Sequence, residues 1–247
     1  MLTPTFIPQV QSEPGDWSRY GLLVVFEGID GCGKTVLIEM LRKRIAKWLV
    51  DQNLSPFVIK LVKEPGATPL GVELRRILFE TIGTQNMAYS VMDCLFLADH
   101  LQNVQDNIVP GLRAGEIILA DRYVFSGQVY STQRATHPLF HDAWQILQGP
   151  TPDLIFLLTG NPEVLLERAQ ARTSETHQTN KVWNTVQQVT DLQKVYIGLL
   201  PQHQQMVEIE DVDSQLPEVL MDELIWPLVK ELLRAKYRPG PQEASHA

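Results

Sequence analysis

One short stretch combines the residue types and the spacing that phosphate chemistry needs. It reads Gly28-Ile29-Asp30-Gly31-Cys32-Gly33-Lys34-Thr35. Glycines let backbone N–H groups approach phosphate oxygens, because a Cβ at those positions would block the approach or forbid the dihedral angles required. The lysine brings a compact positive charge to the outer phosphates, and the threonine hydroxyl is a ligand for Mg²⁺. The stretch therefore predicts a loop whose residues 28–35 bind the phosphates of a nucleotide.

A second pair of candidate residues, Asp121 and Arg122, follows the apolar run Ile117-Ile118-Leu119-Ala120. A carboxylate at a strand end can reach the magnesium ion above a phosphate loop, although a turn or helix-cap aspartate would fit the same position. The arginine offers a planar fork for a phosphate other than the one that Lys34 holds. Two phosphate-binding groups in one cleft indicate phosphoryl transfer between two substrates rather than hydrolysis.

These residues must be positioned by strands that alternate with helical crossovers. Short β-rich apolar runs predict strands at 22–27, 57–62, 116–120, 154–159 and 206–210. Longer segments with helical spacing are 37–49, 70–80, 87–110, 138–148, 162–172, 182–200 and 216–235. The pattern predicts an α/β fold of the P-loop NTPase type, with a five-stranded parallel sheet and helices on both faces. Its ligands should gather at the carboxyl ends of the strands.

Composition narrows the class of protein further. The chain has 247 residues, 44% of them hydrophobic, and a net charge of −8, which disfavours a polyanionic partner such as nucleic acid. No apolar run approaches the length of a membrane span. Two cysteines without metal-ligand spacing fit a reducing cytoplasm. We expect a flexible extension at 1–20, one folded domain at 21–235 and a disordered tail at 236–247.

Three blocks of the sequence resemble the thymidylate kinase family. The blocks are Phe26 to Thr35, Glu64-Pro65-Gly66-Ala67-Thr68-Pro69-Leu70-Gly71, and Asp121-Arg122-Tyr123-Val124-Phe125-Ser126-Gly127-Gln128-Val129-Tyr130. Pro152-Asp153-Leu154 and the helix from Pro162 resemble a fourth, and the likeness spans roughly residues 21–235. The resemblance implies transfer of the γ-phosphoryl group of ATP to dTMP, with Mg²⁺, giving dTDP.

The resemblance also implies roles for individual residues. Asp30, Lys34, Asp121 and Arg122 would form the catalytic set, with Thr35 and Asp121 on the metal. The acceptor site would comprise Glu64, Arg75, Phe96, His100, Arg122, Ser126 and Tyr130, in which Phe96 stacks on thymine and Tyr130 lies under the deoxyribose. Arg168 and Arg172, four residues apart on one helical face next to a lid at about 172–183, would close over ATP. The family is commonly homodimeric, but no residue pattern here shows a dimer.

Several positions depart from the family pattern. His100 stands where the family usually has an arginine that donates to the base, and a neutral imidazole donates only one hydrogen bond. Lys63 replaces the arginine that usually begins the Glu-Pro-Gly block. The lid region, Thr173-Ser174-Glu175-Thr176-His177-Gln178-Thr179-Asn180-Lys181-Val182-Trp183, lacks the usual Asp-Arg-x-Glu run.

These departures leave alternatives open. Arg75 could equally be a solvated helix arginine, Phe96 an ordinary core residue, and the two lid arginines partners of Glu163 or Glu167. A kinase for another nucleotide or nucleoside is the main enzymatic rival. A nucleotide-binding module without turnover is the alternative from a different class. A GTPase is disfavoured, because Asn180-Lys181-Val182-Trp183 lacks the final aspartate of a guanine-reading motif.

Overall fold

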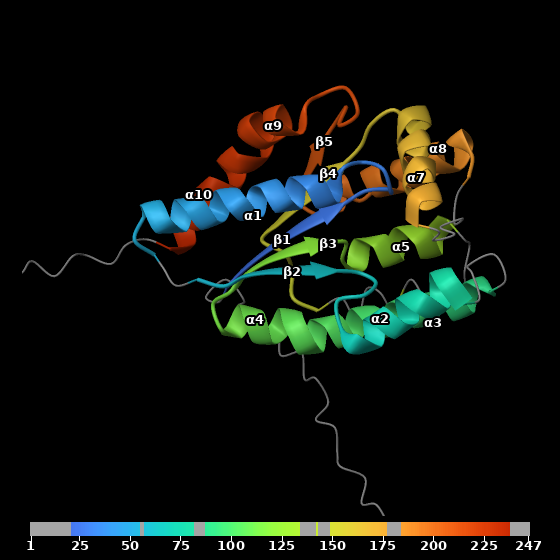
Figure 1. Cartoon of the computed structure of the whole chain (residues 1–247), viewed down its shortest axis with the longest axis horizontal. Helices are drawn as coiled ribbons and strands as arrows, with labels where there is room; N and C mark the ends of the chain where they lie inside the picture. Colours follow the sequence, from blue (N-terminus) through green and yellow to red (C-terminus); the bar gives the residue numbers. More distant parts are fainter. Residues whose placement is uncertain are drawn as a thin grey trace, which may run out of the picture.

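The computed structural model describes residues 21–54, 57–81, 87–133, 142, 149–176 and 184–237. In these ranges five parallel strands form one sheet in the order β2-β3-β1-β4-β5 (Figure 1). The strands are β1 (Leu22–Glu27), β2 (Ile59–Lys63), β3 (Ile117–Asp121), β4 (Leu154–Leu158) and β5 (Met206–Ile209). The predicted fold class is therefore confirmed, and each strand lies within two residues of its predicted bounds. The difference that matters is at β3, whose last residue is Asp121 rather than Ala120.

Helices connect the strands. They are α1 (Lys34–Asp51), α2 (Pro69–Arg76), α3 (Tyr89–Asn103), α4 (Val109–Arg113), α5 (Val124–Gln133), α7 (Pro162–Thr176), α8 (Val186–Ile197), α9 (Pro217–Val219) and α10 (Trp226–Lys236). Wider π turns are η2 (Ile77–Thr81), η4 (Val104–Ile108) and η6 (Leu220–Ile225), and η5 (Leu200–Gln202) is a 3₁₀ turn. The helix expected at 138–148 lies outside the described residues except for position 142.

The π turns lie inside helices that the sequence predicted as continuous. The segment expected at 87–110 runs as α3, η4 and α4, and the segment expected at 216–235 runs as α9, η6 and α10. The helix expected from residue 182 begins at Val186, because Thr185 forms a capping box with Gln188. Apolar spacing predicted the existence of these helices but not their ends or widened turns.

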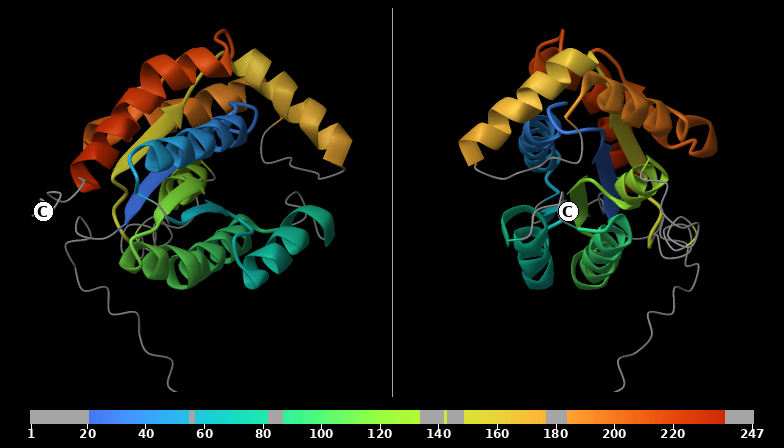
Figure 2. Two further views of the ribbon diagram at one scale, coloured as in Figure 1. Left: turned by 60° about the vertical axis from the view of Figure 1, so that its left-hand side comes forward. Right: turned by 90° about the vertical axis from the view of Figure 1, so that its right-hand side faces the viewer.

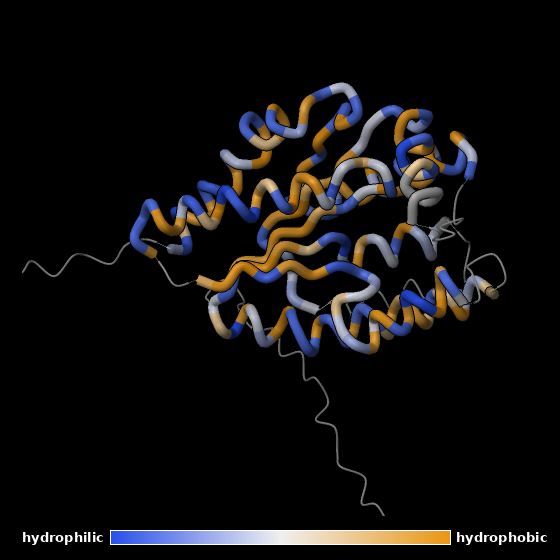
Figure 3. The backbone as a smooth tube through the Cα atoms, in the orientation of Figure 1, coloured by the Kyte–Doolittle hydropathy of each residue, from blue (hydrophilic) through white to orange (hydrophobic). Residues whose placement is uncertain are grey.

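The core forms around the three central strands. Every residue of β1, β3 and β4 is buried, whereas the edge strands β2 and β5 are only partly buried. The central strands stand out as hydrophobic in Figure 3. Continuous apolar strands of this kind are typical of a parallel sheet covered on both faces. In the right-hand view of Figure 2, α1 lies on one side of the strands, and α5 and α8 lie on the other.

Strand register aligns the residues that bear chemistry. Asp121 of β3 lies beside Phe26 of β1 on one side and beside Lys63 of β2 on the other. The loops that follow β1, β2 and β3 therefore begin at the same edge of the sheet. This edge holds the candidate site.

The carboxyl-terminal end of the described chain is tied to the start of the sheet. Lys236 donates to the Gly21 carbonyl at 2.6 Å and pairs with Asp153 at 2.8 Å, and the ring of Tyr237 packs edge-on against Phe57. These two residues belong to the folded body, so the tail expected at 236–247 starts too early. The expected extension at 1–20 and the remainder of that tail lie outside the described residues. None of the described helices combines the length and apolarity needed to cross a membrane.

Candidate active site

The loop between β1 and α1 adopts a conformation that requires glycine. Gly28 and Gly31 have φ angles of 129° and 89°, in the region that L side chains rarely adopt. A Cβ on Gly28 would lie 2.5 Å from the carbonyl oxygen of Leu158, and one on Gly31 would lie 2.4 Å from that of Leu165. The loop is thus pressed between the end of β4 and the helix α7. Its backbone N–H groups adjoin the start of α1, which is the geometry expected of an anion-binding element.

Lys34, the first residue of α1, folds back over this loop. Its ammonium group donates to the carbonyls of Gly28 at 2.9 Å and Ile29 at 2.8 Å, and lies 3.6 Å from the sulfur of Cys32. The side chain is buried, so its charge is held at the loop rather than in solvent. Cys32 is itself buried against the loop, consistent with a packing role.

Thr35 and Asp121 meet above the loop. The threonine hydroxyl donates to one carboxylate oxygen, Oδ2, at 3.0 Å, and Lys63 lies 3.7 Å from the same oxygen. The other oxygen, Oδ1, is buried and has no hydrogen-bond partner among the described residues. Mg²⁺ takes oxygen ligands and is commonly held by one or two carboxylates together with phosphates. A hydroxyl beside an unsatisfied buried carboxylate oxygen fits such an ion.

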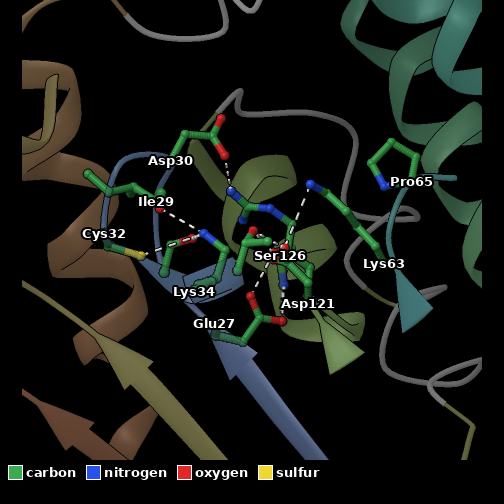
Figure 4. A network of polar contacts seen from close by, with 12 residues as sticks. Glu27, Ile29, Asp30, Cys32, Lys34, Lys63, Pro65, Asp121 and Ser126 are labelled. Carbon is green, nitrogen blue, oxygen red and sulfur yellow. Dashed lines mark hydrogen bonds and ion pairs between the residues drawn. The ribbon is translucent and has the colours of Figure 1, made fainter. Parts of the chain in front are cut away.

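Arg122 follows β3 in a left-handed conformation, with φ of 77°. Its backbone N–H donates to the Phe26 carbonyl, which fixes the residue at the sheet edge. One guanidinium nitrogen donates to the carboxylate of Asp30 at 2.8 Å, and the guanidinium carbon lies 5.7 Å from the ring centroid of Tyr130. Asp30 belongs to the phosphate loop, so this ion pair joins two of the predicted site elements. Figure 4 shows Asp30, Lys34, Asp121 and Ser126 around this edge.

Glu27, the last residue of β1, is a fully buried carboxylate beneath Arg122. It accepts hydrogen bonds from the backbone N–H groups of Tyr123 and Ser126 and from the Ser126 hydroxyl, the last at 2.6 Å. Burial raises the pKa of Glu27, while the charge of Arg122 and these hydrogen bonds act in the opposite direction. The resulting network anchors the start of α5 to the end of β1.

Glu64 opens the loop after β2 and is held by the helix α3. The Asn103 side chain donates to Glu64 at 2.7 Å, and the Nδ1 atom of His100 lies 3.0 Å from the other carboxylate oxygen. The His100 ring has no exposed surface and packs edge-on against Tyr123. The structure therefore places His100 on Glu64, where it fixes the orientation of the carboxylate.

Asp99 lies beside this pair and supports the same loop. Its Oδ1 accepts a hydrogen bond from the Gly66 N–H at 3.1 Å. Burial, reinforced by the negative charge of Glu64, raises the pKa of Asp99 to about 7. Arg75, on α2, donates to the Pro65 carbonyl at 3.3 Å and lies over the ring of Phe79. The interpretation of Arg75 as a freely solvated arginine is therefore wrong, because it is half-buried against the loop.

The other predicted residues are distributed as follows. Phe96 is half-buried, with its ring 6.5 Å from that of Phe79, and Tyr130 lies on α5 next to Arg122. Arg168 is on the exposed side of α7 and donates to the Asp213 carbonyl at 3.1 Å, not to Glu163 or Glu167. Most of the expected lid, and the side chain of Arg172, lie outside the described residues.

Two residues in the network were given no role by the sequence. Glu27 carries a charge at the end of an otherwise apolar strand, a signal that could have marked it as a site residue. Tyr196 comes from α8, and its hydroxyl lies 2.9 Å from the Ser126 hydroxyl and 3.3 Å from Arg122. Nothing in the local pattern around Tyr196 distinguishes it from a core tyrosine, because the contact spans 70 residues.

This arrangement suits transfer of a phosphoryl group between two anionic substrates. The loop holds the buried ammonium of Lys34 in one place and the guanidinium of Arg122 lies in another, with the carboxylate of Asp30 bound to Arg122. Groups that carry positive charge can stabilise the charge that spreads over a transferring phosphoryl group. In the described ranges no three His, Cys, Asp or Glu residues form a group that could hold a metal ion.

Comparison with known proteins identifies relatives. The family model described as thymidylate kinase matches residues 26–220. A thymidylate kinase of Halothermothrix orenii is 35% identical over 156 residues, covering 61% of this chain and 70% of that protein. A thymidylate kinase of Trichormus variabilis is 38% identical over 151 residues, covering 60% of this chain and 68% of that protein.

A solved structure gives the same fold. The crystal structure of thymidylate kinase from Ehrlichia chaffeensis matches with a TM-score of 0.63 and 19% identity, over 85% of this chain and 99% of that one. At this level of identity the likeness supports the fold of the sheet and helices.

Replacement of Asp99 by asparagine should change how stability depends on pH. A carboxyl whose pKa is raised on folding contributes stability below its unfolded pKa, and this contribution is lost as the pH rises through about 7. As the pH rises from 4 to 7, we expect the free energy of unfolding of the unmodified protein to fall by roughly 3 kcal/mol relative to that of Asp99→Asn. Urea unfolding at several pH values measures this difference.

Asp106→Asn is the matched control, because Asp106 is exposed on the adjoining η4. Its pH dependence should follow that of the unmodified protein. Equal pH profiles for Asp99→Asn and the unmodified protein would contradict the assignment.

Proposed function

The chain belongs to the thymidylate kinase family, whose reaction is the ATP-dependent phosphorylation of dTMP to dTDP, and we propose that the cleft described above carries it out. The loop 28–35 holds the ATP phosphates, and Arg122 holds the phosphate of the acceptor. The observation that supports this division most directly is the 2.8 Å ion pair between Arg122 and Asp30. It sets the acceptor clamp immediately beside the donor loop.

The reaction depends on the positioning of the two phosphates more than on covalent chemistry by the protein. The attacking phosphate oxygen is already anionic, so no strong general base is needed. Arg122 aims this oxygen in line with the γ-phosphoryl group, and Asp30 orients Arg122. Lys34 lies where it can neutralise charge that develops on the phosphoryl oxygens, and Arg168 adds a further positive charge from α7.

Thr35 and Asp121 are the residues that would hold Mg²⁺. The ion supplies electrostatic stabilisation of the phosphoryl oxygens when it is bound. The unsatisfied Oδ1 of Asp121 supports this assignment. Glu64, Arg75, Phe96, Ser126 and Tyr130 complete the acceptor site in this proposal, with Phe96 against the base and Tyr130 below the sugar.

A specific observation favours a second candidate for the acceptor. His100 is fully buried and engaged with Glu64, so it does not replace the base-reading arginine usual in the family. A nucleoside monophosphate with a base other than thymine is therefore the alternative substrate.

We also propose that the protein is located in the reducing cytoplasm, supported by two unpaired cysteines, Cys32 and Cys94. Fractionation of cells that express it would test this location.

Lys34→Ala should abolish most turnover and leave the fold intact. Removal of one donor to a developing oxyanion typically lowers kcat by roughly 10²- to 10³-fold. ADP release with Mg-ATP and dTMP, in a coupled assay, measures the loss. Lys43→Ala, an exposed lysine on the same helix, is the control and should retain full activity.

The same assay with a panel of monophosphates tests the acceptor. Faster release with another base would replace dTMP as the substrate, and release with none would favour a nucleotide-binding module. Full activity of Lys34→Ala would contradict the assignment of the donor site.

Asp121→Asn should raise the Mg²⁺ concentration needed for half-maximal activity by about tenfold or more, because one charged ligand becomes a neutral amide. Titration of Mg²⁺ at saturating ATP measures the shift. Asp153→Asn, which alters a carboxylate bound to Lys236 at the other end of the sheet, is the control. An unchanged Mg²⁺ requirement in Asp121→Asn would place the metal elsewhere.

We further propose that the chain forms a homodimer through α2 and α3. These helices pack on each other and expose Leu70, Val72, Tyr89 and Val91, each at least 44% exposed. Large exposed apolar side chains on helices that pack side by side often mark an interface. Sedimentation of the unmodified protein should show a dimer. The double substitution Val72→Asp and Val91→Asp should convert it to a monomer, whereas Val50→Asp on α1 should leave it dimeric. A monomer at every concentration would contradict the proposal.

A further inference from the structure

Tyr196 brings a buried hydroxyl to Arg122 from a distant part of the chain. Its ring has no exposed surface and lies on α8, which packs on α5 and α7. The hydroxyl lies 3.3 Å from the guanidinium of Arg122, 2.9 Å from the Ser126 hydroxyl and 3.3 Å from the carboxylate of Glu27. A buried tyrosine hydroxyl normally finds one partner, and this one is within reach of three.

The contacts form two bridges between the same pair of charges. The same guanidinium nitrogen of Arg122 donates to the Ser126 hydroxyl at 2.9 Å and to the Tyr196 hydroxyl. Each of these hydroxyls in turn donates to the same oxygen of Glu27, at 2.6 Å from Ser126 and at 3.3 Å from Tyr196. Arg122 and Glu27 are therefore linked through two hydroxyl groups that each accept from the cation and donate to the anion.

The protonation states required by these bridges agree with the surroundings. Burial, together with the charge of Glu27, raises the pKa of Tyr196 well above its ordinary value, so the hydroxyl keeps its proton. Burial alone would lower the pKa of Arg122, but Tyr130, Asp30, Tyr196 and Glu27 raise it above its ordinary value. The guanidinium is therefore charged and the phenol is neutral.

We propose that Tyr196 is a positioning residue for the acceptor phosphate: its hydroxyl, with that of Ser126, anchors one nitrogen of Arg122 to Glu27 and so sets the direction of the guanidinium fork. The inference rests on the proposed role of Arg122 as the acceptor clamp. Asp30 holds the other terminal nitrogen at 2.8 Å. Because both terminal nitrogens of the guanidinium are held, Arg122 needs little reorientation to bind a phosphate. A guanidinium that is already positioned binds a phosphate at lower entropic cost than a mobile guanidinium does.

The effect of Tyr196 should be confined to the acceptor side. No described contact joins Tyr196 to Lys34 or Thr35, and the Lys34 ammonium is held by the carbonyls of Gly28 and Ile29. Loss of the Tyr196 hydroxyl therefore leaves the donor loop unchanged and allows the Arg122 fork to adopt other directions. A merely structural role of Tyr196 would lower the fraction of folded enzyme, and with it the apparent kcat, without shifting the affinity for dTMP relative to the affinity for Mg-ATP.

Tyr196→Phe tests this inference, because it removes only the hydroxyl. We expect the KM for dTMP, and the dissociation constant of dTMP measured by calorimetry without ATP, to rise by about tenfold, as for loss of a hydrogen bond to a charged group. The KM for Mg-ATP should stay within twofold of the unmodified value.

Tyr123→Phe is the matched control. Tyr123 is equally buried and adjacent to Arg122, but its hydroxyl donates to the Pro150 carbonyl at 3.0 Å instead of contacting the guanidinium. Dissociation constants for dTMP that are equal in Tyr196→Phe and the unmodified protein, or shifted equally in the two phenylalanine variants, would overturn the inference.

A second variant covers the case in which Tyr196→Phe folds poorly. Glu27→Gln removes the negative charge on which both bridges end, and Glu27 has no exposed surface through which to contact a substrate. We expect it to weaken dTMP binding as well, and an unchanged dTMP affinity in this folded variant would also overturn the inference.

Two readouts separate the inference from the proposed function. Calorimetry with dTMP tests the positioning role, and ADP release tests the kinase reaction. If the unmodified protein binds dTMP but releases no ADP, the proposed function fails. The ratio of the dTMP dissociation constants of Tyr196→Phe and the unmodified protein then still tests the role of Tyr196. If the unmodified protein binds neither dTMP nor any other monophosphate of the panel, both fail.

Discussion

The arrangement of the cleft depends on one buried cation, the guanidinium of Arg122. Arg122 is 9% exposed and sits at the edge of the sheet, where its charge would be unfavourable without nearby counter-charges and hydrogen-bond acceptors. Asp30 contacts one side of the guanidinium, and Glu27 faces the other through two hydroxyls. These requirements explain why a charged residue ends the otherwise apolar β1 and why Ser126 lies at the first turn of α5. The end of β1, the phosphate loop and α5 are held together by the need to stabilise one arginine.

The two halves of the site differ in how far the sequence could predict them. The donor half is contiguous: strand, glycine loop, lysine and threonine follow one another within fourteen residues, so its chemistry is visible in the spacing. The proposed acceptor half is assembled from β1, β2, β3, α2, α3, α5 and α8. Register brings Asp121 and Lys63 side by side, and such contacts are set by packing across the sheet rather than by any local pattern. Tyr196 escaped notice for this reason, since it resembles a core residue until its distant partners are placed, whereas the charge of Glu27 at the end of an apolar strand was a local signal.

The fold itself was more predictable than its details. Continuous apolar strands between amphipathic helices define a covered parallel sheet, and the strand order β2-β3-β1-β4-β5 then brings the expected residues to one edge. The π turns η2, η4 and η6 could not be predicted, because apolar spacing averages over a turn and does not resolve one additional residue. His100 shows a similar limit for side chains. The resemblance to the family implied contact with the base at this position, but the ring contacts the carboxylate of Glu64 and packs edge-on against Tyr123.

Lys34 illustrates how the fold prepares a charge for binding. Its ammonium is already withdrawn from water and donates to two neutral carbonyls of its own loop, at 2.9 and 2.8 Å. An arriving phosphate would replace neutral acceptors with charged ones, and charge-assisted hydrogen bonds are about twice as strong as neutral ones. The desolvation of the lysine is therefore a cost of folding rather than of binding, offset by the carbonyl contacts. Arg122 follows the same logic with carboxylate and hydroxyl partners, so Lys34 and Arg122 are both fixed and dehydrated by the protein before any phosphate would arrive.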